Sequence, residues 1–222
     1  MKSSARTLDT VIVLAIDTAT PAVTAGLVRL DPTTEVLATR VTVDARAHGE
    51  LLTPHITAVL AEAGIGFDLV DAIVCGTGPG PFTGLRVGMV TAASLGHALG
   101  VPVHGVCTLD AIAAEAPDTA SLLVVTDARR REVYWAHYEH GRRIAGPDVV
   151  APAQLPDVGA TAAAGTCADV TGLPVVGPAH PSPAGLIAAA RQGLDSAPGE
   201  FRPLYLRRPD AVEPGARKKV SA

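Results

Sequence analysis

The sequence has few cysteines and no long apolar run. Cys75, Cys107 and Cys167 are the only three cysteines in 222 residues; no two form a CxxC pair, and an odd number does not make a disulfide framework. We therefore expect buried thiols in a reducing cytoplasm. No uncharged apolar run approaches the ~20 residues that span a bilayer. The apolar run at residues 11–16 is short and lies between Asp9 and Asp17, which favours a buried strand over a signal peptide.

Positive charge is not in excess either. The chain carries 18 Lys and Arg against 22 Asp and Glu, with a formal net charge of −4 and a pI of about 5.9. This balance excludes a global basic field that could hold nucleic acid by itself. The two halves differ, because residues 1–110 carry 6 basic and 10 acidic side chains, whereas residues 111–222 carry 12 of each. A contact with a polyanion would therefore favour the second half.

What the chain does have is enough apolar residues for a substantial core. Hydrophobic residues make up 48% of the sequence and charged residues 18%, which excludes wholesale disorder. Apolar runs predict strands at residues 11–16, 22–30, 36–43, 71–76, 101–106, 122–126 and 133–139. Helical spacing and caps predict helices at residues 46–63, 83–99, from Thr108 to before Pro117, and 184–192 after Ser182. We expect loops at residues 145–159 and 195–203 and a mobile basic tail with Arg217, Lys218 and Lys219.

These elements favour an α/β fold with a mixed sheet in each of two lobes, residues 1–107 and 108–222. The two halves also begin alike. An apolar strand ends in Asp17 or Asp127, and the next strand begins six residues later at Val23 or Val133. This offset of 110 residues indicates a duplicated unit, although two unrelated hairpins could produce the same match.

The most unusual segment is the Gly- and Pro-rich loop at residues 76–84 (GTGPGPFTG). Glycines allow backbone N–H groups to approach a ligand, and the loop leads into a helix N-terminus, which favours anions. However, the loop contains no GxxxxGK[ST] pattern, and Pro79 and Pro81 lack N–H donors. The alternative interpretation is a stiff turn that sets the angle between strand and helix.

The helix after this loop carries small residues at every fourth position: Gly84, Gly88, Ala92 and Gly96. Positions i and i+4 form one row on a helix, so this row exposes nearly bare backbone. Glycine inside a helix costs roughly 1 kcal/mol relative to alanine, which indicates close packing against something. Two partners are open: the chain's own sheet or helix 46–63, or a second protein.

The candidate catalytic groups do not form a recognised constellation. His137 and His140 are three residues apart, but they stand at a predicted strand end and hence on opposite faces. No HExxH or HxxxH spacing occurs, and we expect the seven histidines to be solvated or hydrogen-bonded within the fold. Asp17 and Asp127 end strands, where α/β enzymes bind ligands, but an aspartate in a turn is also typical of an Asx-turn or a cap. The segment 129–131 is three consecutive arginines, read either as a surface turn or as a polyanion or partner contact.

Five segments resemble the TsaB (YeaZ) family, bacterial subunits of the machinery that makes threonylcarbamoyladenosine in tRNA. They run in order along about 200 residues: 13–20 (VLAIDTAT), 75–86 (CGTGPGPFTGLR), 105–109 (GVCTL), 127–134 (DARRREVY) and 203–207 (PLYLR). The composition is similar to that of actinobacterial members. The resemblance implies an actin-like ATPase fold, of the ribonuclease-H-like superfamily, with two duplicated lobes.

The resemblance also implies a non-catalytic role in the cytoplasm. Members pair with the transferase subunit TsaD, which modifies adenosine 37 of tRNA, and the ATPase TsaE joins them; they form homodimers when alone, contact tRNA only through the complex and do not bind membranes. The pairing surface of the family maps onto helices 46–63 and 83–99. We therefore expect the partner interface to include the row Gly84, Gly88, Ala92 and Gly96 together with Leu52, Ile56 and Val59.

Catalysis is not expected of this chain. The transferase carries an Asn-His-Leu-x-x-His pattern whose histidines bind metal, and Thr108 and Ile112 stand at the two matching positions. Neither residue is a credible ligand for a transition metal in that pattern, so no metal site and no catalytic residue are predicted.

Nucleotide binding remains open as a weak activity. The resemblance to actin-like ATPases places a weak ATP or ADP site at Asp17, Thr18, Gly78, Gly80 and Thr83, although no cofactor is required for the expected role. The alternative function is a small ATPase or kinase of the same fold, with Asp17 or Asp127 holding Mg²⁺ and the Gly-rich loop holding phosphate.

Overall fold

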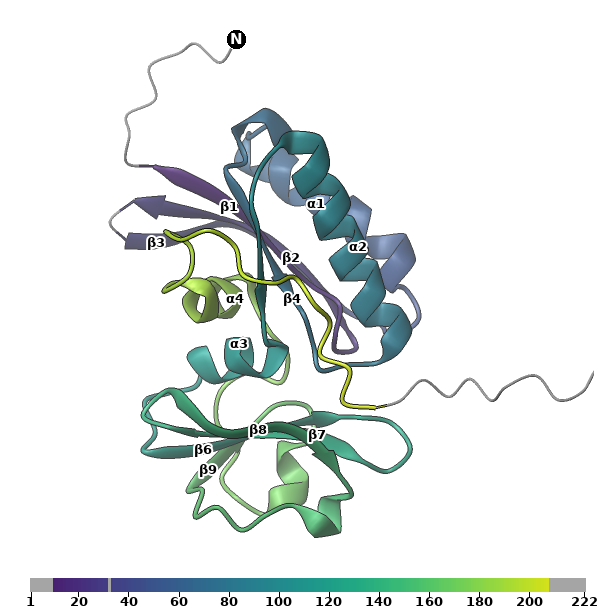
Figure 1. The fold of residues 1–222 in the computed structure, drawn as a ribbon, viewed down its shortest axis with the longest axis vertical. Coiled ribbons are helices and arrows are strands. Elements are labelled where there is room, and N and C mark those ends of the chain that lie inside the picture. The colour runs from purple at the N-terminus through teal and green to yellow at the C-terminus, as the bar shows by residue number, and fades with distance from the viewer. Residues whose placement is uncertain (1–9, 32, 208–222) are drawn as a thin grey trace, which may run out of the picture.

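The structure consists of two lobes, each built on one β-sheet (Figure 1). This computed structural model describes residues 10–31 and 33–207; the basic tail with Arg217, Lys218 and Lys219 lies outside the described residues. Within those ranges, no helix combines the length and the apolar character needed to cross a bilayer.

The first lobe contains a mixed sheet of five strands in the order β3-β2-β1-β4-β5. Its strands are β1 (Val11–Asp17), β2 (Ala22–Asp31), β3 (Thr33–Val43), β4 (Ala72–Gly76) and β5 (Val103–Val106). The first three strands form an antiparallel meander, in which Leu14 pairs with Leu27, and β4 and β5 continue the sheet in parallel, with Ile73 beside Leu14. A short 3₁₀ turn, η1 (Phe67–Leu69), precedes β4.

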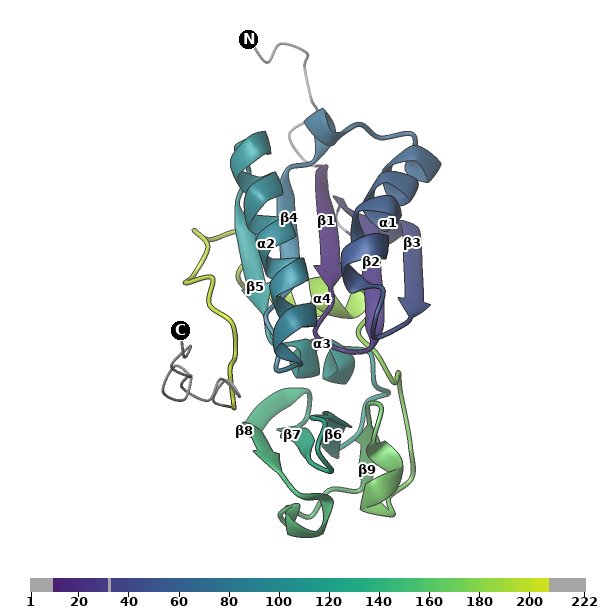
Figure 2. The same ribbon diagram turned by 90° about the vertical axis from the view of Figure 1, so that its right-hand side faces the viewer.

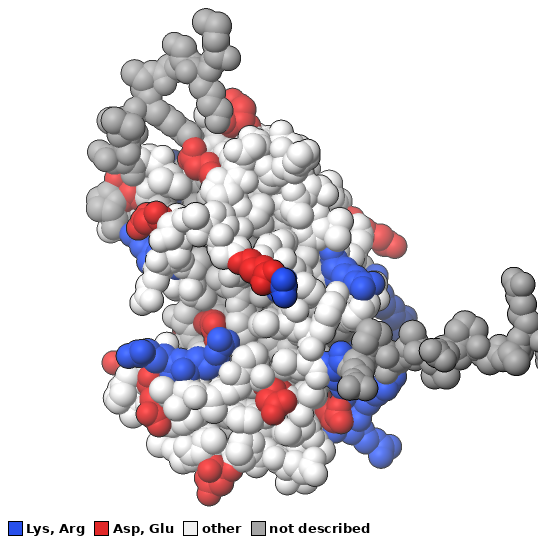
Figure 3. Space-filling view, viewed as in Figure 1, with Lys and Arg blue, Asp and Glu red and all other residues white. Residues whose placement is uncertain are grey.

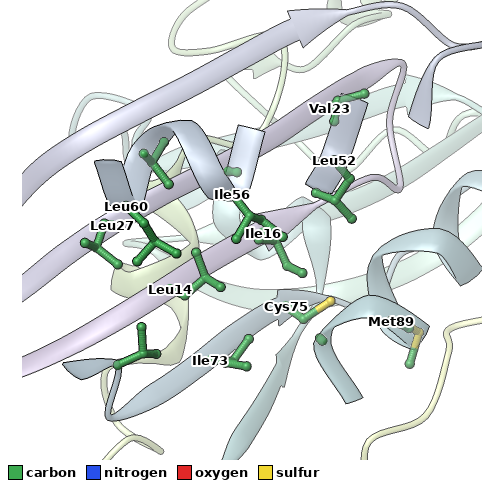
Figure 4. Packing of buried hydrophobic residues seen from close by; sticks show 14 of the residues in the cluster. Leu14, Ile16, Val23, Leu27, Leu52, Ile56, Leu60, Ile73, Cys75 and Met89 are labelled. Carbon is green, nitrogen blue, oxygen red and sulfur yellow. The ribbon is translucent and has the colours of Figure 1, made fainter. Parts of the chain in front are cut away.

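Helices cover both faces of this sheet (Figure 2). Helices α1 (His48–Ala63) and α2 (Phe82–Leu99) lie side by side on one face, and α4 (Pro183–Ala190) lies on the other. The uninterrupted apolar sequence of β1 follows from this arrangement, because alternate side chains of the strand enter different cores. Leu14 and Ile16 pack against α1 and α2 (Figure 4), whereas Val13 and Ala15 pack against Leu186 and Ile187 of α4.

The second lobe has a smaller mixed sheet in the order β8-β7-β6-β9. Its strands are β6 (Ser121–Asp127), β7 (Val133–Glu139), β8 (Arg142–Val150) and β9 (Ala162–Ala164), with 3₁₀ turns η2 (Pro152–Gln154) and η3 (Ala168–Thr171). Helix α3 (Thr108–Ala114) lies between this sheet and the first lobe (Figure 1). Leu109 and Ile112 of α3 are fully buried in the core of the second lobe.

The two sheets share one connectivity, as the duplicated hairpin predicts. In each sheet, a hairpin is followed by a third antiparallel strand on one side and a parallel strand on the other, so β1-β2-β3-β4 matches β6-β7-β8-β9. Strand β6 lies 110 residues after β1 at both of its ends. The fold is therefore α/β with two similar lobes of mixed sheet plus helices.

Three local predictions are wrong. Residues 145–150, the first part of the loop predicted at 145–159, belong to strand β8, because pairing with β7 satisfies a segment whose Gly and Pro content favours turns. Helix α4 belongs by its packing to the first lobe, although the sequence places it in the lobe at 108–222. Thr108 does not cap α3: the residue at the N-cap position is Cys107, and the Thr108 hydroxyl is bonded elsewhere.

Other predictions are confirmed. The Ser182 hydroxyl accepts a hydrogen bond from the Gly185 N–H at 3.2 Å, and Pro183 begins α4, which ends at Ala190. Cys75 and Cys107 are buried free thiols and Cys167 is half-buried. Two buried histidines are hydrogen-bonded within the fold, as expected: His48 Nε2 lies 2.8 Å from the Thr20 carbonyl oxygen and His137 Nε2 lies 2.8 Å from Ser121 Oγ. His104 departs from the expectation, because it is buried and its Nε2 has no hydrogen-bond partner among the described residues.

Candidate functional site

The most polar buried point of the first lobe is Asp17, at the end of β1. Its side chain has no exposed surface, and its Oδ1 accepts a hydrogen bond from the Ala19 N–H at 2.8 Å. Its Oδ2 accepts one from the Thr108 hydroxyl at 2.6 Å. Burial raises the pKa of Asp17 from 3.8 to about 6, and the bonds from Thr108 and from the backbone oppose that rise. Asp17 is thus a structural link between β1 and α3.

The predicted nucleotide residues do not meet at one cavity. Asp17 and Thr18 are buried and bonded within the chain, Gly78 is buried as well, and Thr83 is exposed on α2. The Thr18 hydroxyl donates to the Gly84 carbonyl at 2.7 Å and accepts from the Gly88 N–H at 2.9 Å. The polar atoms of Asp17 and Thr18 are thus engaged with α2 and α3, and weak nucleotide binding by this chain stays a prediction.

The row of small residues on α2 faces the chain's own lobe. A Cβ atom at Gly84 would lie 2.6 Å from the Thr18 carbonyl oxygen, and one at Gly88 would lie 2.5 Å from Thr18 Oγ1. Ala92 has no exposed surface, and Gly96 packs closely against Val103 of β5. The prediction that this row contacts a partner is wrong: the missing side chains let α2 approach the β1–β2 turn and β5.

The predicted interface residues of α1 are also internal. Leu52, Ile56 and Val59 are 0–2% exposed and belong to the core between the sheet and the two helices. Their spacing marks the inner stripe of an amphipathic helix, and the sheet is what that stripe covers. The surface that α1 and α2 leave uncovered is their opposite side, whose exposed residues include Thr57, Ala61, Val90, Ala93, Ser94 and Ala98.

A cleft of about 250 Å³ opens where the two lobes meet, next to the Gly- and Pro-rich loop. Its lining comes from three parts of the chain: Gly80, Pro81 and Phe82 from the loop and the start of α2, Ala128, Arg129, Arg130 and Tyr134 from the β6–β7 hairpin, and Tyr205, Leu206 and Arg207 from the C-terminal segment. The loop of the first lobe and the turn of the second lobe therefore form the two walls of one site.

Aromatic and guanidinium groups form the first-lobe wall of this cleft. The rings of Phe82 and Tyr205 stack with centroids 4.5 Å apart and planes at 22°. The Arg86 guanidinium carbon lies 3.7 Å from the Phe82 ring centroid, and Arg86 Nε donates to the Tyr205 hydroxyl at 3.0 Å. These contacts hold the Tyr205 side chain, which is 39% exposed, in one position.

The second-lobe wall includes Arg129 and Arg130, and Arg131 follows them in the same turn. Arg129, Arg130 and Arg131 all have left-handed backbone conformations, with φ of 62°, 56° and 62°. Such a conformation costs an L-residue roughly 1–2 kcal/mol. Asp127 holds the turn through a 2.8 Å bond from the Arg129 N–H to its Oδ1, so Asp127 is the Asx-turn residue that the sequence allowed.

The C-terminal segment fastens the two walls together. Arg207 forms an ion pair with Glu132 and donates to the Arg129 carbonyl at 3.4 Å. The Leu204 N–H donates to the Thr77 carbonyl at 2.8 Å, on the other wall. A segment of a few residues thus bridges both lobes at the cleft, as the yellow ribbon in Figure 1 shows.

The part of the chain that the structure describes contains no recognisable metal-binding site. No group of three or more His, Cys, Asp or Glu side chains is placed to hold a metal ion there. Thr108 and Ile112 are both fully buried, and the Thr108 hydroxyl is committed to Asp17.

Comparison with known proteins identifies the family of the chain. The chain is 35% identical over 130 residues to the tRNA threonylcarbamoyladenosine biosynthesis protein TsaB of Escherichia coli, covering 57% of this chain and 54% of that protein. It also matches the structure of YeaZ from Pseudomonas aeruginosa with a TM-score of 0.71 and 26% identity, covering 88% of this chain and all of that one. The family model described as TsaD, tRNA N6-adenosine threonylcarbamoyltransferase, matches residues 35–193. The chain belongs to the TsaB/YeaZ family.

This TsaB-family chain also has a relative of nearly its own length. An uncharacterised protein of Mycobacterium tuberculosis is 58% identical over 201 residues, covering 90% of this chain and 93% of that protein. The match to YeaZ identifies the two duplicated lobes as the actin-like ATPase fold that the resemblance implies.

Sequence reasoning quoted the residues of the cleft but did not assign them to one site. Phe82, the arginine turn and Tyr205 lie in three of the TsaB-like segments. The available signal was that these segments carry aromatic and basic side chains with no place in a core. Their meeting depends on the return of the chain from the second lobe to the first at α4, which no local pattern predicts.

Proposed function

We propose that this TsaB-family chain is the non-catalytic subunit of tRNA threonylcarbamoyladenosine biosynthesis. In this proposal it pairs with a TsaD-type transferase subunit, which modifies adenosine 37, and works with a TsaE-type ATPase. The observation that carries the proposal is the hydrogen bond from the Thr108 hydroxyl to the Asp17 carboxylate, in which both residues are buried. A lobe whose strand-end aspartate is used for packing supports a role in assembly and not in turnover.

The outer side of α1 and α2 is the surface that we propose for pairing. In the sequence of these two helices only Glu50, Glu62 and Arg86 are charged. This outer side of the two helices faces the viewer in Figure 2. Val90 lies on it with 63% of its surface exposed. Apolar residues at the centre of an interface with few charges are typical of stable complexes.

Replacing Val90 by arginine is expected to prevent pairing and to leave the fold intact. The added guanidinium would be buried without a partner in the interface, whereas in the single chain it would lie in water. We expect pairing to weaken about tenfold or more. Size-exclusion chromatography of the chain alone, and co-purification with the transferase subunit, measure the effect, and the melting temperature should stay unchanged.

Val175→Arg is the matched control for this experiment. Val175 is 60% exposed but lies in the second lobe, away from α1 and α2. This variant should pair as the parent chain does. If Val90→Arg pairs as well as Val175→Arg, the proposed surface is wrong.

Hydrolysis of ATP separates this proposal from the alternative of an ATPase or kinase. The purified chain is expected to release no phosphate from ATP above the rate of a protein-free control, with or without Mg²⁺. The reason is that Asp17, a carboxylate that the alternative needs for Mg²⁺, is bonded to Thr108 and has no exposed surface. Substantial hydrolysis that disappears in Asp17→Ala would instead support the enzyme.

A further inference from the structure

We propose that the cleft between the lobes binds one nucleotide of a single-stranded RNA segment directly. The base would pack against the Phe82–Tyr205 pair, and the adjoining phosphates would lie along the arginine turn at residues 129–131. The choice of RNA rests on the proposed function, whereas the chemistry of the site comes from the cleft itself. This inference differs from the expectation that the chain meets tRNA only through its complex.

The aromatic wall suits a base. Flat rings accept every base by stacking, which is how proteins bind single strands without reading their sequence. Here the Tyr205 ring is fixed on one side by Phe82 and at its hydroxyl by Arg86, and 39% of the residue remains exposed. The platform is therefore organised before any ligand arrives, which lowers the entropy lost on binding.

The charges around the cleft suit phosphates. Five arginines line or flank it: Arg86, Arg129, Arg130, Arg131 and Arg207. Arg129 forms an ion pair with Asp127, and Arg207 forms one with Glu132. Five arginines thus gather at one place in a protein whose net charge is −4. Figure 3 shows blue side chains gathered along the right-hand edge, beside the junction of the lobes.

The backbone conformation of the arginine turn also supports a binding site. Three consecutive left-handed arginines are held by Asp127 on one side and by Glu132 and Arg207 on the other. Strain of this kind persists where the surrounding structure imposes it, and it is concentrated at functional sites. A glycine would take this conformation freely, so the arginine side chains are kept in spite of the backbone that they require.

The volume of the cleft indicates a ligand that is only partly enclosed. Its volume is about 250 Å³. Pockets that enclose a whole drug-sized ligand measure about 300–1,000 Å³. The cleft is smaller than this range, so it would enclose only part of a nucleotide, and the phosphates would then lie outside, where Arg130 and Arg131 are exposed.

Fluorescence anisotropy with the full chain and a labelled single-stranded RNA of about 12 nucleotides tests this inference. Binding is expected, and it should weaken steeply as salt rises from about 50 to 200 mM. Arg130→Gly should weaken binding about tenfold and reduce the salt dependence by about one phosphate contact. The same variant should keep or raise the melting temperature, because glycine relieves the left-handed backbone. A merely structural role for Arg130 would not separate these two readouts.

Tyr205→Ala and Tyr205→Phe test the base. The alanine variant should weaken binding about fivefold to hundredfold, and the phenylalanine variant, which keeps the ring, should stay within about twofold of the parent. Arg29→Ala is the control for charge, since Arg29 pairs with Glu35 at the opposite end of the first sheet and its loss should leave RNA binding unchanged. If Tyr205→Ala does not fold, Arg130→Gly decides alone.

Two results would overturn the inference. One is RNA binding that is absent, or that Arg130→Gly leaves as in the parent. The other is displacement of the RNA by AMP or ATP at equal phosphate concentration, which would make the cleft a mononucleotide site. Neither result touches the pairing experiment with Val90→Arg, so failure of RNA binding and failure of the proposed function are distinguishable.

Discussion

Replacing Gly88 by leucine is expected to unfold the first lobe or to lower its free energy of unfolding by more than about 3 kcal/mol. A Cβ atom at this position would lie 2.5 Å from Thr18 Oγ1, and a leucine side chain needs far more room. The displaced Thr18 hydroxyl would lose its bonds to the Gly84 carbonyl and the Gly88 N–H, both of which are buried. Urea unfolding followed by circular dichroism measures the loss.

Ala93→Leu is the matched control on the same helix. Ala93 is exposed on the outer side of α2, so the same leucine side chain there should change stability by less than about 0.5 kcal/mol. This outcome would show that the cost belongs to the inward row and not to a leucine in α2. A Gly88→Leu chain as stable as Ala93→Leu would contradict the observed packing of the row.

The row of small residues on α2 shows which part of the packing the sequence could predict. Spacing of four residues correctly predicts that the backbone of α2 is closely approached along one line. It does not say by what, because the physical requirement is only an atom within contact distance. The sequence leaves the row open to a partner or to the lobe itself, and the choice depends on where α2 lies on the sheet, which the long-range contacts with Thr18 and Val103 settle.

Local patterns and duplication did predict most of the architecture. The runs that become β1, β4 and β6 are apolar because both of their faces are covered, and their periodicity carries that information directly. The position of α4 and the cleft are different. They depend on a chain that leaves the first lobe after β5 and returns to it 70 or more residues later, so the residues that meet share no local pattern.

Asp17→Asn is expected to remove the contribution of Asp17 to the pH dependence of stability between pH 4 and pH 6. The pKa of Asp17 is 3.8 in the unfolded chain and about 6 in the folded one, so the folded state holds a proton that the unfolded state has lost. This group therefore contributes its stability fully below pH 4, and that contribution is lost as the pH rises through 6. The loss is about 3 kcal/mol, because one pKa unit corresponds to about 1.4 kcal/mol.

Asparagine carries no charge at any pH and keeps an oxygen for the Ala19 N–H. At pH 7 the variant should therefore be more stable than the parent by about 1–3 kcal/mol, and near pH 4 the two should be similar. Urea unfolding at pH 4, 5, 6 and 7 gives both curves. Parallel curves for the parent and Asp17→Asn would show that Asp17 is not the titrating group.

Thr108→Val separates the effect of the Thr108–Asp17 hydrogen bond on stability from the effect of burying Asp17. The Thr108 hydroxyl donates to the carboxylate at 2.6 Å, and a bond to a charged acceptor is stronger than one to a neutral acceptor. Thr108→Val should therefore cost more at pH 7 than at pH 4 in the parent chain, and its cost should no longer depend on pH in the Asp17→Asn background. That outcome would mean that Thr108 stabilises an ionised Asp17 in the interior. The aspartate would then have a structural role at a strand end, a position where α/β enzymes bind ligands.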